Sequence, residues 1–210
     1  MTNPAEPQFS EVITLYCGCM EEIKLRVDVV RLFLGGQLST YLPPLVESVC
    51  LQIRKILELI ALASLVAVKD EYSRQYQKFA QHWHAGRILR DIEKINPSFY
   101  PIPTRQVLDP INGKPFRVEN VKEGYLTRNE FVTVYETCAE MLHAKNPFGP
   151  PKDFEAAARN IPIWISRITT LLNHHQIQLI RPDLQLWVLM QAVNDGRVHA
   201  FIMKKIPISS

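Results

Sequence analysis

The arrangement of apolar and polar residues along the chain predicts a mainly α-helical protein. Apolar residues recur every three or four positions over most of the sequence, which is the spacing that gathers them on one face of a helix. The longest and most apolar of these segments is expected to form a central helix that runs through the whole domain. In all, the pattern predicts about five helices, at residues 10–34, 43–68, 71–95, 127–145 and 151–176.

Residues that favour helix ends support several of these boundaries. Gly35-Gly36 ends the first helix, and Pro43-Pro44 suits the first turn of the second, where a missing N–H costs nothing. Thr127-Arg128-Asn129-Glu130 is a capping box, a clear signal for the start of a helix. Pro162 falls inside the last helical segment, which it is expected to kink or divide.

Two regions depart from the helical period. Prolines and glycines punctuate a long loop over residues 97–126, and a turn at 109–114 inside it is predicted to join short strands at 106–108 and 116–118. Near the C-terminus, Asn194-Asp195-Gly196 lies between apolar runs and predicts a β-hairpin over residues 184–206. Since an isolated hairpin is marginally stable, it should pack on the helices, join the loop strands or pair with another subunit. The prediction is one domain over residues 1–210, a helical bundle with a C-terminal β-hairpin.

Composition narrows the class of protein without identifying a reaction. The chain has 210 residues, 47% apolar and 21% charged, as expected for one globular domain. Its net charge of +3 is too small to predict nucleic-acid binding by itself. The longest apolar run is about 10 residues, against the ~20 that a membrane span needs. Without a visible signal peptide, and with four cysteines mostly in apolar helical patterns, the chain is expected to be cytoplasmic and reduced.

No motif predicts a metal or a cofactor. His82-Trp83-His84 and Cys17-Gly18-Cys19 contain ligand types, but on a helix positions i and i+2 point about 200° apart and cannot hold one ion. Phosphate-binding glycine loops and the common hydrolase motifs are missing from the sequence. We therefore expect neither a metal site nor a cofactor.

Two histidines and four charged residues are candidates for chemistry. Arg167 and His174 would share a face of the last helix, so that a guanidinium could hold a phosphate while an imidazole moves a proton; the alternative is an exposed pair near a helix end. His143 lies in the last turn of its helix, where a cation is favoured or where it simply bonds a free carbonyl. Arg54 and Glu58, together with Glu47, form either a solvated stripe or a semi-buried charged set that faces a cleft.

The central helix, with Arg54-Lys55 followed by Glu58 and then Ile60-Ala61, resembles that of the HEPN superfamily of helical bundles over about residues 10–180. The resemblance implies a metal-independent endoribonuclease of a bacterial toxin or phage-defence system, or a member without activity that acts as a binding module. Arg167 and His174 match the spacing of the family's catalytic arginine and histidine, with six residues between them, although Ile168 replaces the usual polar follower.

The same resemblance implies further roles and partners. His143 is the alternative catalytic histidine, although it has no arginine at the corresponding distance before it. Arg54, Glu58 and Asn146 are candidate substrate contacts. The expected partners are RNA, a second copy of the chain as a homodimer, and an antitoxin or other protein; no membrane partner is expected.

Overall fold

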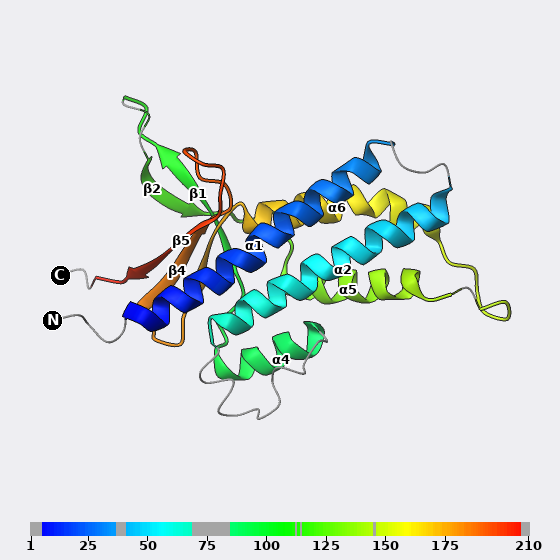
Figure 1. The fold of residues 1–210 in the computed structure, drawn as a ribbon, viewed down its shortest axis with the longest axis horizontal. Coiled ribbons are helices and arrows are strands. Elements are labelled where there is room, and N and C mark those ends of the chain that lie inside the picture. Colours follow the sequence, from blue (N-terminus) through cyan, green and yellow to red (C-terminus); the bar gives the residue numbers. More distant parts are fainter. Residues whose placement is uncertain are drawn as a thin grey trace.

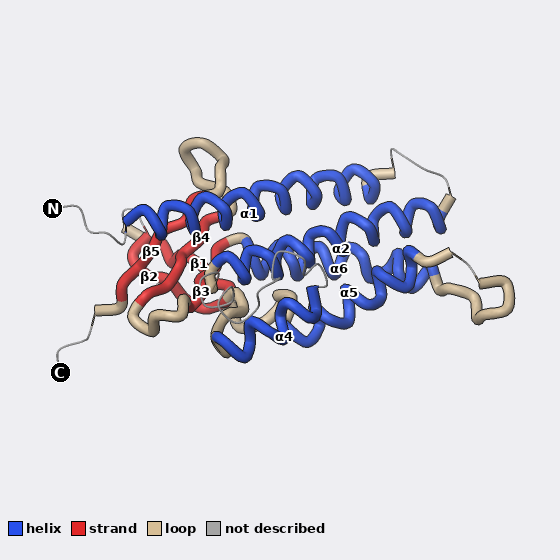
Figure 2. Tube along the Cα trace, turned by 60° about the horizontal axis from the view of Figure 1, so that its bottom comes forward, coloured by secondary structure: helices blue, strands red, loops and turns tan. Residues whose placement is uncertain are grey.

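The computed structural model describes residues 6–36, 41–68, 85–111, 113, 115–144 and 146–206. Within these ranges, five helices pack beside a five-stranded antiparallel sheet, which lies at one end of the helices (Figure 1, Figure 2). The prediction of a mainly α-helical bundle with only a C-terminal hairpin is therefore wrong, because the fold is mixed α/β. The physical reason is that residues 174–178, predicted as the end of a helix, form a strand between the two hairpins, and its pairing with residues 102–103 joins segments distant in the sequence.

The helix α2 (Leu42–Val66) is central, as predicted. It packs against α1 (Glu6–Leu34), α4 (Ala85–Ile95), α5 (Arg128–Leu142) and α6 (Phe154–Leu172). Its apolar stripe is buried at every turn from Val46 onward because a helix surrounded by helices has little surface left for water. None of the described helices is both long enough and apolar enough to cross a membrane.

The helix ends confirm some predictions and correct others. The capping box begins α5, with Thr127 as its N-cap, and Asp153 caps α6 by accepting a hydrogen bond from the backbone N–H of Ala156 at 2.8 Å. Pro162 lies inside α6 without dividing it. The helix ends at Leu172 rather than at residue 176, because the next residues leave it for the sheet. The first part of the predicted helix 71–95, with His82-Trp83-His84, lies outside the described residues.

The sheet has the strand order β2-β1-β3-β4-β5 and is antiparallel throughout. Its strands are β1 (Ile102–Leu108), β2 (Pro115–Asn120), β3 (His174–Gln178), β4 (Leu184–Leu189) and β5 (His199–Lys204). Both predicted hairpins are present, and β3 lies between them. Of the three alternatives for the C-terminal hairpin, the structure therefore shows that it joins the loop strands and packs on the helices.

One face of this sheet packs against the helices. Side chains alternate between the two faces of a strand, and the buried members Ile177, Leu186 and Val188 point to the same side. Helix α1 contacts β5, while α6 contacts β1 and β3. We call this side the inner face; the opposite side contributes no apolar side chain of β3 or β4 to the core.

Candidate functional site

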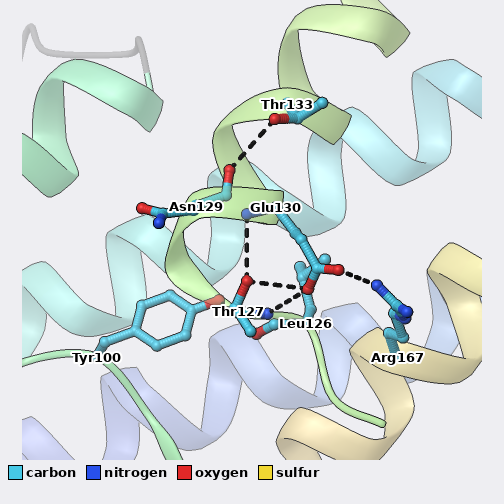
Figure 3. Close-up of polar contacts among 7 residues, drawn as sticks. All are labelled: Tyr100, Leu126, Thr127, Asn129, Glu130, Thr133 and Arg167. Atoms are coloured by element: carbon cyan, nitrogen blue, oxygen red, sulfur yellow. Dashed lines mark hydrogen bonds and ion pairs between the residues drawn. The ribbon is translucent and has the colours of Figure 1, made fainter. Parts of the chain in front are cut away.

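Arg167 is held at the junction of α5 and α6 (Figure 3). Its guanidinium pairs with one carboxylate oxygen of Glu130, whose other oxygen accepts hydrogen bonds from the backbone N–H and the hydroxyl of Thr127 at 3.0 and 2.9 Å. The backbone carbonyl of Arg167 accepts from Leu126 N–H at 3.0 Å. In its turn, the Leu126 carbonyl accepts from the Tyr100 hydroxyl at 2.9 Å. Arg167 thus ties the start of α5 to α6, and Glu130 compensates its charge.

His174 does not share a helix face with Arg167, because it is the first residue of β3. Its ring Nδ1 hydrogen-bonds to Thr104 Oγ1, and that hydroxyl donates to the His174 carbonyl at 3.2 Å. Its side chain is only 6% exposed, and burial lowers the pKa of the imidazole. General acid–base catalysis on RNA needs phosphate and proton donor within about 3 Å of each other. The geometry gives Arg167 and His174 no such common centre.

His143 and Asn146 lie in the segment between α5 and α6, at the end of the helices away from the sheet (Figure 1). His143 is the C-cap of α5 and is exposed, and its carbonyl accepts a hydrogen bond from the Lys152 ammonium. The Asn146 side chain closes a turn by accepting from Phe148 N–H at 3.0 Å. These two candidates are separated from both Arg167 and the sheet.

Arg54 and Glu58 are the candidates that the structure does bring together. The Arg54 Nε donates to Glu58 Oε1 at 3.2 Å, and each side chain is 29% exposed. Tyr135 from α5 completes the set: its hydroxyl donates to Glu58 at 3.1 Å and accepts from Arg54 at 3.0 Å, and the guanidinium lies 4.6 Å from its ring centroid. Burial, followed by the nearby Glu58 charge, raises the pKa of Tyr135. The set is semi-buried, and its charges compensate each other between α2 and α5.

A surface that the sequence analysis missed is the outer face of the sheet. Register places one set of side chains from four neighbouring strands on this side. Ile102, Phe201 and Met203 on it are 37%, 49% and 43% exposed. We call this set the open face, and it consists of Ile102, Thr104, Gln106, His174, Gln176, Gln178, Gln185, Trp187, Leu189, His199, Phe201 and Met203.

Rings form a continuous group on the open face. Trp187 and Phe201 are direct cross-strand partners on β4 and β5. The His174 ring lies edge-on to Trp187 with centroids 6.2 Å apart, and the His199 ring lies 6.3 Å from that of Phe201. Since cross-strand Cβ atoms are about 5 Å apart, the four rings form one connected group. His174 is itself buried at 6% exposure, whereas Phe201 is 49% exposed and Trp187 and His199 are half-buried. Phe201, Trp187 and His199 are therefore the rings that can stack on flat ligands.

The polar groups of the open face are uncharged or basic. No position of this set is Asp or Glu, while four are glutamines. Lys205, which follows β5, brings an ammonium to the edge by donating to Gln178 Oε1 at 2.7 Å. One carboxylate lies at the rim: Asp195 accepts from His199 Nε2 at 2.9 Å. Hydrogen bonds from the Arg197 backbone and from His199 hold the pKa of Asp195 below its ordinary value.

To predict the open face from the sequence, one would have to recognise β3 as a strand, because β3 joins β1 to β4. Leu184-Gln185-Leu186-Trp187 alternates in the manner of a half-buried strand, which marks Trp187 as an outward-facing aromatic residue. The helical pattern of residues 151–176, however, places His174 and Gln176 at the end of a helix and gives no sign of the sheet that joins them to Trp187. Within the described residues, no group of three or more His, Cys, Asp or Glu side chains is arranged to hold a metal ion.

Comparisons with known proteins add no family to this geometry. No family model, no curated protein and no solved structure matches the chain.

Proposed function

We propose that this chain is a non-catalytic binding module that binds single-stranded RNA on the open face of its sheet. The observation that carries the proposal is the group of accessible rings of Trp187, Phe201 and His199 on a face whose own positions include no carboxylate. Every base has a π-face, and stacking of one base on an aromatic side chain contributes about 1–3 kcal/mol. Trp187 and Phe201 offer two adjacent stacking positions.

The surrounding polar groups suit a nucleic-acid strand better than a second protein. The amide of Gln176 has no hydrogen-bond partner in the described part of the chain, and it lies directly opposite Trp187, where it can reach a base edge or a 2′-hydroxyl. Lys205 can neutralise a phosphate at the edge of β5. The positions of the open face include no carboxylate, and Asp195 at its rim is paired with His199, so the face and a polyanion are electrostatically compatible.

The nuclease form of the HEPN hypothesis has less support than the binding form. A metal-independent nuclease needs one centre that holds the phosphate and moves the proton. Arg167 of α6 pairs with Glu130 of α5, whereas the His174 ring bonds Thr104 in the sheet, so the two side chains are held by different elements. We place the module in the cytoplasm, where its four thiols stay reduced and RNA is accessible. A homodimer, an antitoxin and other protein partners stay predictions.

The test is fluorescence anisotropy with a labelled single-stranded RNA of ten nucleotides in EDTA. We expect binding without cleavage, and Trp187→Ala and Phe201→Ala should each weaken it by about tenfold. The matched control is Phe148→Ala, which removes an aromatic ring that is 96% exposed outside the sheet; it should bind as the wild type does.

Two outcomes would overturn the proposal. One is a folded wild-type protein that binds no single-stranded RNA, which would leave the open face as a protein-binding surface. The other is a Trp187→Ala, Phe201→Ala double variant that retains full affinity. Cleavage in EDTA that depends on His174 or His143 would instead favour the nuclease.

A further inference from the structure

A separate cavity lies where α1 passes the end of α6. Its volume is about 240 Å³, and its walls come from α1, from the C-terminal turn of α6 and from Met190 and Gln191, which follow β4. None of its lining residues belongs to the open face. At ~30 Å³ for each water molecule in the liquid, the volume corresponds to roughly eight waters, which is room for one heterocyclic base with its sugar.

The floor of this cavity is apolar. Ile23 and Val27 of α1 face Ile168 and Leu172 of α6, and all four are buried. Met190 closes the floor from the sheet side. Ile23, Ile168 and Leu172 are 0–1% exposed and offer almost no surface, so the surface that a flat ring can cover comes from Val27 and the Met190 thioether, each 8% exposed.

Three uncharged polar groups converge on the cavity without internal partners. Thr169, Asn173 and Gln191 line it, and their side chains make no hydrogen bond with any other described residue. Each amide presents donor and acceptor atoms side by side. Asn and Gln use that pair to bond two atoms of an adenine edge at once. The polar wall therefore fits the edge of a purine better than it fits an aliphatic ligand.

Charged groups follow one another along the α1 side of the rim. Asp28 and Arg31 pair at 3.0 Å, and their side chains are 65% and 59% exposed. The guanidinium has five N–H donors and uses one of them on Asp28, so it retains donors for a phosphate. The Asp28 carboxylate can also accept from sugar hydroxyls, the role of an acidic residue in many nucleotide sites. Lys24 is occupied by Glu21 at 3.1 Å and the Gly196 carbonyl at 2.6 Å.

We propose that this cavity binds a purine nucleoside monophosphate. The base lies on the apolar floor with its edge toward Asn173 and Gln191, the sugar lies beside Asp28, and the phosphate meets Arg31 at the rim. The order of groups follows the antiparallel course of α1 and α6 (Figure 1): the last turn of α6 shares the cavity with the stretch of α1 that begins at Ile23, and Arg31 lies farther along α1. None of the residues in this proposed nucleotide site belongs to the open face, so the two proposals are independent.

Isothermal titration calorimetry of the full chain tests whether the cavity binds a nucleoside monophosphate. AMP is the probe, and adenosine, CMP and inorganic phosphate are the comparisons. We expect AMP to bind more tightly than each of the three. Arg31→Gln should weaken AMP by about tenfold and leave adenosine unchanged, because it removes a charged contact to the phosphate alone. Asn173→Ala should weaken both AMP and adenosine, by roughly threefold to tenfold.

The matched control for Arg31→Gln is Arg159→Gln, which removes an arginine of α6 that is 70% exposed and lies outside the cavity lining; AMP binding should not change. Absence of AMP binding to the folded protein overturns the proposal, as does equal affinity for AMP and inorganic phosphate, which would indicate an anion patch only. Trp187→Ala must leave AMP binding unchanged. Failure of the nucleotide site and failure of the RNA-binding face are thus separate results.

Discussion

Two consecutive histidines show how differently the two faces of the sheet are built. His175 points to the inner face and is fully buried. Its Nδ1 bonds the Leu172 carbonyl at 2.7 Å, and because a carbonyl only accepts, that nitrogen carries the proton. Its Nε2 must therefore accept from the Tyr16 hydroxyl, also at 2.7 Å. His174, one residue earlier, faces the open side beside Thr104 and Trp187.

Polar groups serve the fold on the inner face, whereas on the open face some of them, unlike the bonded His174 and Thr104, remain available. On the inner face, every hydrogen-bonding atom of the imidazole has a partner inside the protein, as the cost of an unpaired buried polar group demands. On the open face, Gln176 keeps an amide without a partner among the described residues, and Phe201 keeps a ring that is 49% exposed. Changes to the inner face should therefore affect stability, and changes to the open face should affect binding.

The largest effect should come from truncating the inner face. Leu186→Ala removes a side chain with 0% exposure from a central strand and leaves a cavity, so it should lower the free energy of unfolding by about 2–5 kcal/mol. Its neighbour Gln185 lies on the open face, and Gln185→Ala should change that free energy by less than ~1 kcal/mol. Urea unfolding followed by circular dichroism measures both. Equal losses for the two variants would contradict the assignment of faces.

The next effect is a dependence of stability on pH. Burial lowers the pKa of His175 to about 4, against an ordinary value of 6.5. Between these values the unfolded chain binds a proton that the folded protein does not, so stability is fully present above pH ~6.5 and falls as the pH drops toward 4. The total loss is about 3 kcal/mol at 1.36 kcal/mol for each pKa unit.

Urea unfolding from pH 7.5 to pH 4 measures this loss. Two variants separate the contributions of His175 and His174 to the dependence of stability on pH. His175→Gln should remove most of the slope. Burial also lowers the pKa of His174, in the same direction and without the complete enclosure of His175, so His174→Gln should remove a smaller part. A slope that survives His175→Gln unchanged would show that other groups cause it.

The helical part of this fold could be predicted from the sequence, because its determinants are local. The apolar period over α1 and α2 and the capping box of α5 involve residues within a few positions of one another. The strand β3 could not be predicted in this way. No proline or glycine separates it from α6, and it is extended because it pairs with the next strand, β4, and with β1, which is distant in the sequence.

The error in β3 carried over to the predicted site. Arg167 and His174 share a helix face only if the helix continues past Leu172. The helix ends there and His174 begins a strand, so their spacing in the sequence does not bring the two side chains to one face. The proximity of Arg54 and Glu58 could be predicted, because residues i and i+4 on a helix are neighbours whatever the rest of the fold. The open face depends on the register of four strands. Trp187 therefore gave a usable signal only as a single outward-facing aromatic residue in an alternating strand.

A smaller effect compares one hydrogen bond on each face. Tyr16→Phe leaves the Nε2 of His175 without a donor in a fully buried site and should cost about 2 kcal/mol. Thr104→Val leaves the His174 ring, which is 6% exposed and less completely enclosed than His175, without its hydroxyl partner and should cost about 1 kcal/mol. Thermal unfolding at pH 7.5 measures both, and it is the order of the two losses that tests the comparison. A larger loss for Thr104→Val would indicate that the open face is as tightly built as the inner one.

The smallest effect concerns the charge at the edge of the open face. Lys205 is exposed and bonds only Gln178 among the described residues, so Lys205→Gln should change the free energy of unfolding by less than ~0.5 kcal/mol. If Lys205 contacts one phosphate of a bound RNA, its removal should lower the slope of log affinity against log salt by about 0.7, the value for single strands. Anisotropy titrations at several salt concentrations measure that slope.

Lys152→Gln is the control, because Lys152 lies between α5 and α6, away from the sheet, and its loss should leave the slope as it was. An unchanged slope for Lys205→Gln, with RNA still bound through Trp187, would place the phosphates along a different edge of the sheet.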